Sequence, residues 1–232
     1  DTENGHARYA AALHRYSENR LPILSLARAG IKQWEDLAVG RAMVFSTFLA
    51  LSYNSIDLFG RCCGVIGLGE VGVGAAGSLR EWHWRTAAPW NLSPFPRDIL
   101  VYDHDNAAMA RAQNARFTAV PKRELLRSAD VIFCATGNRS ILRADWEYIR
   151  PGTHVVTCTS PDDEIELPSK IVPTSFPGRI WRTAGGALLV NGGKAANFLF
   201  PDHQSTIISP CIYLTHAGLI RGAKALDGLR CR

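Results

Sequence analysis

The sequence predicts an α/β fold: a Rossmann-type doubly wound parallel sheet with flanking N-terminal and C-terminal helices. Two observations carry this prediction. Apolar runs of strand length alternate with helical patterns between residues 62 and 158, which is the spacing of βαβ units. The first apolar run leads directly into the glycine-rich segment Gly67-Leu68-Gly69-Glu70-Val71-Gly72, and a helical pattern follows that segment.

The individual elements follow from hydrophobic periodicity and from breaker residues. Helices are predicted over residues 6–18, 34–53, 106–114, 122–127 and 210–225, and another follows the glycine-rich segment 67–74 and runs to about residue 80. A helical turn is predicted at 146–149 and a short strand or turn at 23–26. Strands are predicted over 62–66, 99–102, 131–135 and 154–158. A hairpin is predicted between 188–190 and 195–198, turning at Gly192-Gly193. Residues 81–97 contain three Trp and three Pro and fit neither period, so they are predicted to be an inserted loop.

These elements suggest three segments. Residues 1–60 form a helical segment on the hinge or substrate side, residues 61–200 a dinucleotide-binding domain with the insertion 81–97, and residues 201–232 a C-terminal helix. A chain of 232 residues that is 47% hydrophobic can bury a full core. Since the sequence begins with Asp1 rather than Met, it is compatible with a longer protein whose N-terminal part precedes it.

Composition excludes several classes of partner. The net charge is +5, but the basic residues are spread along the chain rather than clustered with aromatic residues, so no nucleic-acid partner is expected. No apolar run is long enough to span a bilayer, and no membrane partner is expected. The six cysteines lack zinc-site spacing, which predicts no metal and buried, reduced thiols in a cytoplasmic protein. We also expect a homo-oligomer.

The glycine-rich segment predicts a phosphate-binding turn. Gly67 permits the tight turn, Gly69 lets the backbone approach a diphosphate, and Gly72 allows the following helix to pack closely on the strand. The start of that helix, around Glu70 and Val71, presents unpaired amides and a positive dipole to the phosphates. The alternative is a glycine-rich turn in an α/β fold that binds no nucleotide.

Asp103 stands at the end of the second predicted strand, where a carboxylate is expected to bind the ribose hydroxyls. Its distance from the glycines exceeds the usual spacing of about 20 residues, and removing the insertion 81–97 restores that spacing. A carboxylate at this position repels a 2′-phosphate. The sequence therefore predicts NAD rather than NADP as the cofactor.

These and further motifs resemble the NAD-binding domain of the S-adenosylhomocysteine hydrolase family. The matching segments are Asp1-Thr2, the glycine turn with the additional Gly74, Ala135-Thr136-Gly137-Asn138 with Asp145 and Pro151-Gly152, Asp162-x-Glu164-Ile165, and Gly193-Lys194-x-x-Asn197. The resemblance implies that Thr2 contacts the cofactor and that the loop Ala135 to Asn138 lies beside the nicotinamide ribose. It also implies that Asn197 meets the nicotinamide amide.

The resemblance further implies a function. In that family, bound NAD oxidises the ribose 3′-hydroxyl of a nucleoside substrate, and a Lys with an Asp four residues later handles this hydroxyl. Lys32 and Asp36 keep that spacing and share one helix face, and His203 lies near the position of a substrate-loop histidine. The pair is alternatively a surface ion pair. The chain departs from the family pattern at Leu37, where the family has Asn, and at Ser160, where it has His.

Three hypotheses about function remain open at this point. The first is an NAD-dependent enzyme of the adenosylhomocysteinase type that acts on a nucleoside-like small molecule. The second is a homologue with weakened catalysis that binds NAD and acts through partners or as a regulatory protein. The third is a dehydrogenase of the 2-hydroxyacid type, which would need an Arg and a His near the nicotinamide. Arg139 or Arg179 and His154 or His203 are available for it.

Overall fold

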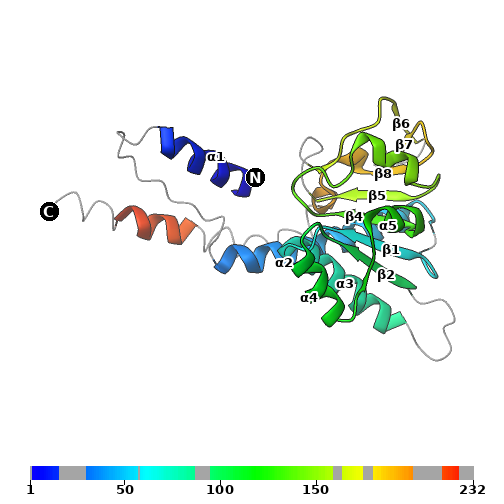
Figure 1. Cartoon of the computed structure of the whole chain (residues 1–232), viewed down its shortest axis with the longest axis horizontal. Helices are drawn as coiled ribbons and strands as arrows, with labels where there is room; N and C mark the ends of the chain where they lie inside the picture. The colour runs from blue at the N-terminus through cyan, green and yellow to red at the C-terminus, as the bar shows by residue number, and fades with distance from the viewer. Residues whose placement is uncertain are drawn as a thin grey trace. The chain divides into compact units, whose positions relative to one another are not determined.

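The computed structural model describes residues 2–15, 30–56, 58–86, 95–158, 164–174, 180–200 and 216–224. The chain divides into two compact units, the first formed by Asp1–Glu35 with Asp202–Arg232, and the second by Asp36–Pro201. The first unit contains α1 (Thr2–Arg15), the start of α2 (Gly30–Tyr53) and a helical segment over residues 216–224 (Figure 1). The second unit contains the rest of α2 and the sheet.

Eight strands form one sheet within the described part of the second unit, in the order β3-β2-β1-β4-β5-β8-β7-β6 (Figure 1). The pairings from β3 to β8 are parallel, and those of β7 with β8 and with β6 are antiparallel. The strands are β1 (Cys62–Ile66), β2 (Asp98–Tyr102), β3 (Thr118–Ala119), β4 (Val131–Cys134), β5 (His154–Thr157), β6 (Ile171–Pro173), β7 (Ile180–Thr183) and β8 (Leu188–Val190). This confirms the predicted Rossmann-type fold. The strand order reverses between β1 and β4, and such a switch point opens a crevice at the carboxyl ends of the strands.

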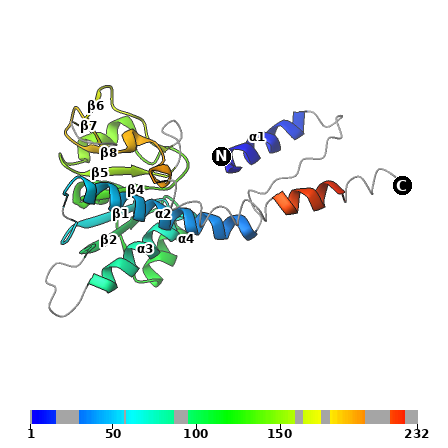
Figure 2. The ribbon, with the colours of Figure 1, turned by 180° about the vertical axis from the view of Figure 1, so that it is seen from behind.

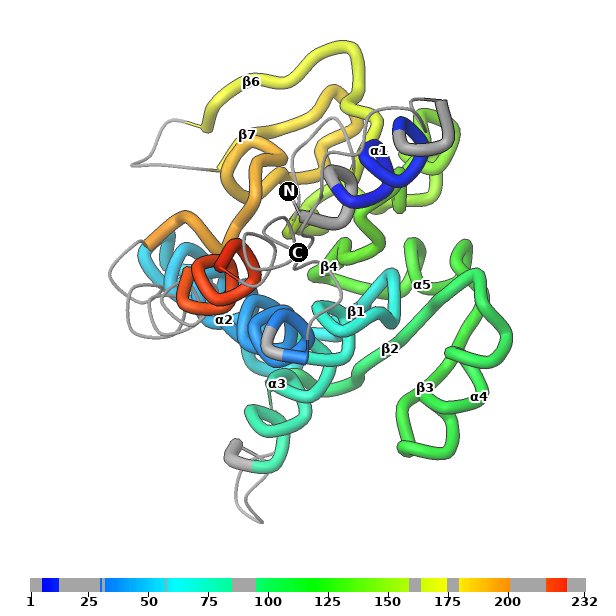
Figure 3. Tube along the Cα trace, turned by 90° about the vertical axis from the view of Figure 1, so that its left-hand side faces the viewer, coloured from blue at the N-terminus to red at the C-terminus, as the bar shows by residue number. Residues whose placement is uncertain are grey.

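Helical elements cover both faces of this sheet (Figures 2 and 3). On one face, α2, α3 (Glu70–Thr86) and α4 (Asn106–Asn114) share a core with alternate strand residues such as Val65 and Phe133. On the other, α5 (Lys122–Ser128) packs with Ile66 and Ile132, beside the 3-10 helix η1 (Arg143–Tyr148). Because both faces are buried, the central strands are continuous apolar runs rather than alternating ones.

The structure corrects the prediction for residues 81–97. Helix α3 continues to Thr86, so the first six of these residues are helical and not part of an inserted loop. Trp82 stacks on Phe48 of α2 with ring centroids 4.9 Å apart, and Glu81 pairs with Arg41 of the same helix. Trp82 departs from the expected period because it packs between two helices, whereas Trp84 is 69% exposed. Residues 87–94 lie outside the described part of the chain.

The predicted hairpin between residues 188–190 and 195–198 does not form. Strand β8 pairs with β7, which precedes it, and residues 196–198 form the 3-10 helix η3 (Ala196–Phe198) instead of a strand. Between β8 and η3, the 3-10 helix η2 (Asn191–Gly193) carries Gly192 and Gly193 with positive φ values of 64° and 82°. The glycines therefore redirect the chain toward the end of β5, where Ala195 forms a parallel bridge with Thr157.

Helices α2 and α3 cross with their backbones in contact. A Cβ atom on Gly40 would lie 2.0 Å from the carbonyl oxygen of Val71, and one on Gly74 would lie 2.3 Å from that of Leu37. No side chain larger than hydrogen fits at either position without moving a backbone. The additional glycine at position 74 thus serves the packing of α3 on α2, which fixes the direction in which α3 starts.

The cysteine side chains were predicted to be buried thiols. Cys62, Cys63, Cys134 and Cys158 are buried, and burial raises the pKa of Cys62 to about 11. The other two cysteines lie outside the described ranges.

Among the described helices, none combines the length and the apolar character needed to cross a bilayer. No group of three or more His, Cys, Asp or Glu side chains suited to a metal ion occurs in the described segments.

His154, the first residue of β5, provides a prediction about stability. The imidazole is 3% exposed, and neither ring nitrogen has a hydrogen-bond partner among the described residues. Burial, reinforced by the positive charge of Arg61, lowers the pKa of His154 from 6.5 to about 4, although the nearby Asp130 opposes the shift. The unfolded chain therefore binds more protons than the folded chain between these two values, and stability falls as the pH drops through this window.

Replacing His154 with leucine should remove this dependence. As the pH falls from 7 to 4, we expect the wild type to lose about 3 kcal/mol more unfolding free energy than His154→Leu does. Denaturant unfolding at a series of pH values measures the difference. Parallel pH profiles for the two proteins would show that His154 is not a buried neutral imidazole.

Candidate dinucleotide-binding site

The glycine turn between β1 and α3 has the geometry of a phosphate cradle. Gly67 has a φ of +94°, and a Cβ atom there would lie 2.7 Å from the backbone of Ala135. A Cβ atom on Gly72 would lie 1.8 Å from the carbonyl oxygen of Gly67, so α3 starts directly against the turn. A Cβ atom on Gly69 would meet nothing within 4 Å. The turn is thus closed on its protein side and open above Gly69, where the first amides of α3, around Glu70 and Val71, have no partner within the helix.

Asp103 follows β2 and is tied to this turn. Its Oδ2 accepts a hydrogen bond of 2.6 Å from the amide of Leu68, and its Oδ1 accepts one of 2.9 Å from the amide of Asp105. The Nδ1 atom of His104 lies 3.1 Å from the same Oδ1. The side chain is 11% exposed. A carboxylate offers about four lone-pair sites, so Asp103 keeps acceptor capacity for a ligand hydroxyl while its backbone contacts hold it in place.

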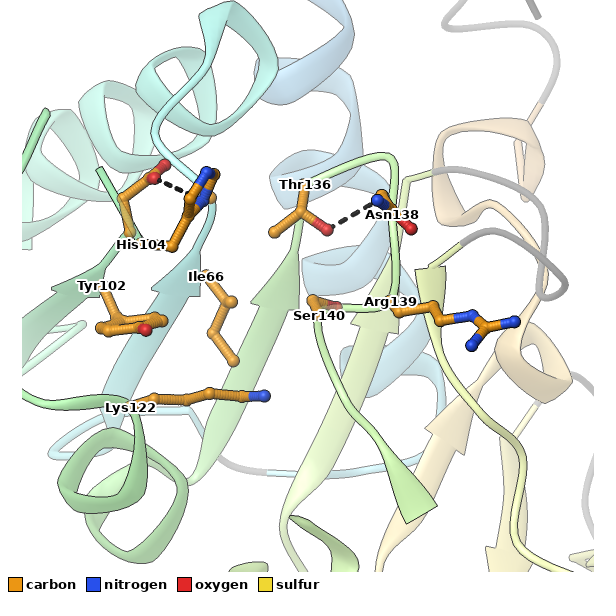
Figure 4. Close-up of a pocket in the computed structure, with 10 residues that line it drawn as sticks. Ile66, Tyr102, His104, Lys122, Thr136, Asn138, Arg139 and Ser140 are labelled. Carbon is orange, nitrogen blue, oxygen red and sulfur yellow. Dashed lines mark hydrogen bonds and ion pairs between the residues drawn. The ribbon is translucent and has the colours of Figure 1, made fainter. Parts of the chain in front are cut away.

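A cavity of about 310 Å³ connects these groups (Figure 4). Its walls are the ends of β1 and β2, the loop after β4 and the start of α5; Gly67, Asp103, Lys122, Thr136 and Asn138 are among the lining residues. The volume lies at the lower end of the range for small-molecule pockets, about 300–1,000 Å³. The cavity is at the switch point, where doubly wound sheets bind their ligands.

The loop after β4 is held by a buried carboxylate. Glu164 is 0% exposed, and its Oε1 accepts hydrogen bonds of 2.9 Å from both the amide and the hydroxyl of Thr136. Its Oε2 accepts one of 2.8 Å from the amide of Gly137. Its backbone carbonyl oxygen also accepts hydrogen bonds from the amide and hydroxyl of Ser140. Glu164 therefore sets the course of residues 136–140, which form one wall of the cavity.

Sequence reasoning used Glu164 as part of a motif and missed this role. The available signal was weak, because Glu164 is one of three consecutive acidic residues before the apolar Ile165, and Glu166 follows directly. Ile141 and Ile165 form a parallel bridge that brings the two segments together. The hydrogen bonds of the Glu164 carboxylate join it to Gly137 and Thr136, which lie 27 and 28 positions away in the sequence. No local sequence pattern indicates these contacts.

Asn197 is placed on the other side of the switch point. It lies in η3, shortly after the bridge between Thr157 and Ala195 at the end of β5. The side chain is 3% exposed, and its Oδ1 has no hydrogen-bond partner among the described residues. A buried acceptor without a partner is costly, and a carboxamide NH2 group would supply the missing donor. Asn197 therefore carries an available hydrogen-bond acceptor near the end of β5.

The predicted catalytic residues are divided between the two units or lie outside the described part of the chain. Thr2 and Lys32 belong to the first unit, whereas Asp36 is the first residue of the second. Lys32 lies in α2, where its Nζ is 3.4 Å from Glu35 Oε2. His203 lies outside the described residues, as do Arg179, Ser160 and Asp162.

Two residues considered for a hydroxyacid dehydrogenase do not face the cavity. His154 begins β5, so it lies at the amino edge of the sheet, opposite the cavity. Arg139 is at the rim, where its Nη1 lies 3.3 Å from Glu166 Oε1 and its guanidinium points away from the cavity (Figure 4). His154 is therefore excluded from contact with a cofactor at the switch point.

Comparison with known proteins identifies similar folds. L-alanine dehydrogenase is 15% identical, with a TM-score of 0.53, over 85% of this chain and 57% of that chain. The A chain of dipicolinate synthase from Bacillus subtilis is 15% identical, with a TM-score of 0.44, over 88% of this chain and 63% of that one. Transhydrogenase from Sinorhizobium meliloti is 14% identical, with a TM-score of 0.45, over 77% and 55%.

The chain spans less than two thirds of the length of each of these proteins. No protein-family model matches the chain, and no curated protein sequence is significantly similar to it. The likeness to L-alanine dehydrogenase supports the fold. That fold, together with the glycine turn at its switch point, defines the chain as a Rossmann-type α/β protein of the kind that binds dinucleotides.

Proposed function

We propose that the chain binds NAD across the carboxyl edge of its parallel sheet. The observation that carries the proposal is the position of Asp103, whose carboxylate lines the same cavity as Gly67 and is bonded to the amide of Leu68 in the glycine turn. In this proposal the diphosphate lies over Gly69 at the start of α3, between Asp103 and Asn197. The cofactor residues are Thr2, Gly67, Gly69, Glu70, Val71, Gly72, Asp103, Ala135, Thr136, Gly137, Asn138 and Asn197.

We further propose that the chain belongs to an NAD-dependent enzyme that oxidises a secondary hydroxyl of a nucleoside-like substrate. The resemblance to the S-adenosylhomocysteine hydrolase family supports this proposal through Lys32, Asp36, Asn197 and His203. Bound NAD supplies the acceptor for the hydride of the secondary alcohol. Lys32 would take the hydroxyl proton, and Asp36, one helical turn later, would favour its charged form. His203 would contact the substrate.

A dehydrogenase that acts on a different secondary alcohol or on an amino acid fits the same cofactor site. None of the residues that line the cavity is specific for a nucleoside substrate. A homologue that binds NAD without turnover fits it as well. One experiment separates these functions. The purified protein is loaded with NAD and mixed in turn with adenosine, S-adenosylhomocysteine, alanine and 2-hydroxyacids, while NADH absorbance is recorded.

Reduction of NAD by adenosine or S-adenosylhomocysteine would support the nucleoside substrate. Reduction by alanine or 2-hydroxyacids alone would support the dehydrogenase, and bound NAD that is never reduced would support the homologue without turnover. Failure of the protein to bind NAD at all would contradict the proposal as a whole.

The proposed role of Lys32 leads to a specific expectation. Lys32→Ala should leave NAD affinity within about twofold and lower turnover by at least about 100-fold, since a positioned proton acceptor contributes about 10²–10⁴ in rate. The matched control is Glu35→Gln, which removes the carboxylate 3.4 Å from the Lys32 ammonium but keeps the lysine. Steady-state kinetics and NAD titration measure both quantities. Normal turnover of Lys32→Ala would make the lysine a surface contact only.

A further inference from the structure

Lys122 forms the floor of the cavity. It is the first residue of α5, and its side chain extends beneath Ile66 on the side of the cavity opposite His104 (Figure 4). Its Nζ lies 2.6 Å from Asp145 Oδ2 in η1. The same oxygen accepts a hydrogen bond of 2.8 Å from the amide of Leu142. The Lys122 ammonium is thus held at a defined place by a carboxylate that is itself anchored to the backbone.

The Lys122 side chain lines the cavity and is largely shielded from bulk water. The Lys122 side chain is 23% exposed and that of Asp145 is 18% exposed. A lysine ammonium has three hydrogens to donate and accepts none, and the bond to Asp145 uses one of them. The other basic side chain at the rim, Arg139, points away from the cavity and pairs with Glu166. The cavity therefore offers a ligand an acceptor group at Asp103 and a donor group at Lys122.

The role that we infer for Lys122 rests on the proposed binding of NAD. If Asp103 holds the adenosine ribose and the glycine turn holds the diphosphate, the base occupies the rest of the cavity, between the ribose and the floor. Adenine carries a lone pair on N1, the ring nitrogen at the end of the base far from the ribose. We propose that Lys122 is a specificity-determining residue that donates a hydrogen bond to N1 of the adenine base.

The proposed contact distinguishes adenine from 1-deazaadenine, in which a C–H group replaces N1. The C–H group has no lone pair to accept a hydrogen bond from the ammonium, and the 6-amino group beside it offers no acceptor in its place. A hydrogen bond to a charged group is worth more than a neutral one, and leaving either partner unmatched in a partly buried site is costly. Lys122 should therefore favour NAD over nicotinamide 1-deazaadenine dinucleotide, which differs from NAD at this one position of the base.

The test measures the dissociation constants of these two dinucleotides by calorimetry for the wild type and for Lys122→Met. For the wild type, we expect the 1-deazaadenine dinucleotide to bind at least about 10-fold more weakly than NAD. For Lys122→Met, the ratio should fall below about 3. The matched control is Arg139→Met, which removes a cation from the same rim and should keep the wild-type ratio. If the Met variant does not fold, Lys122→Gln replaces it, with a fall of the ratio expected again.

The outcomes separate this inference from the proposed function. A wild type that binds neither dinucleotide overturns both. A wild type that binds NAD but shows no preference between the bases overturns only the role of Lys122. The same holds if Lys122→Met keeps the full preference, because the pair Lys122–Asp145 would then be structural. A ratio that falls in Lys122→Met and persists in Arg139→Met supports the proposal.

Discussion

Replacing Asp103 with alanine is expected to weaken NAD binding by about 100-fold. The carboxylate would accept hydrogen bonds from the ribose hydroxyls, and a hydrogen bond to a charged group contributes about 1.5–3 kcal/mol. The substitution also removes the acceptor that holds the Leu68 amide at 2.6 Å, so the glycine turn loses a contact on its ligand side. Calorimetric titration with NAD measures the change. The control is Asp105→Asn, which keeps an N-cap acceptor for the amide of Ala107 and lies beyond the cavity lining.

The same position should control the choice between NAD and NADP. Asp103→Asn removes the negative charge that repels a 2′-phosphate, and Asp103→Arg places a positive charge there. Both variants are expected to lower the ratio of the NADP and NAD dissociation constants, by about 10-fold or more for the arginine variant. If the alanine variant binds NAD as the wild type does, and the arginine variant keeps the wild-type preference, Asp103 does not contact the ribose.

The second large effect is expected at Glu164. Glu164→Gln keeps the size of the side chain but leaves one acceptor oxygen where the protein uses two. Either the amide of Gly137 or the Thr136 pair then faces an NH2 group instead of an acceptor. Because each buried donor without a partner costs about 1–3 kcal/mol, we expect the unfolding free energy to fall by about 2–4 kcal/mol. Denaturant unfolding measures this loss.

Glu166→Gln is the matched control for this substitution. Glu166 lies two residues further along, accepts a hydrogen bond from the amide of Arg143 and pairs with Arg139, but its side chain is 36% exposed. A partly solvated ion pair contributes little, so the control should lose less than about 1 kcal/mol. NAD affinity should also fall in Glu164→Gln, since residues 136–140 line the cavity. Equal stability of the two variants would show that Glu164 does not hold the loop.

The sequence predicted most of the elements that position the site. Strands β1, β2, β4 and β5 were predicted within a residue or two because they are apolar on both faces and bounded by Gly, Pro or Asp. The turn at Gly67 was predicted because its three glycines stand between a strand and a helix. These features are local, because the residues of a single segment determine the conformation of that segment.

The errors concern segments whose conformation depends on distant partners. Residues 81–86 were predicted as a loop because their aromatic residues break the amphipathic period, and the partner that explains them is Phe48 of α2. Residues 195–198 were predicted as a strand that pairs with 188–190. In the structure, β8 lies between β5 and β7, and η3 follows the bridge to Thr157.

The sequence by itself determined that this protein has a doubly wound sheet, a glycine-rich turn at Gly67–Gly72 and an acidic residue at the end of the second strand. Strand burial and tight turns leave a pattern in adjacent residues. Only the tertiary structure decided what surrounds them. Lys122 lines the cavity from α5, Glu164 holds the loop after β4, and Asn197 lies in η3. Glu164 and Lys122 are held in place by bonds to residues more than 20 positions away. An isolated carboxylate, amine or amide is expected to be solvated, and folding alone shows which of them are buried beside the cavity or near the switch point.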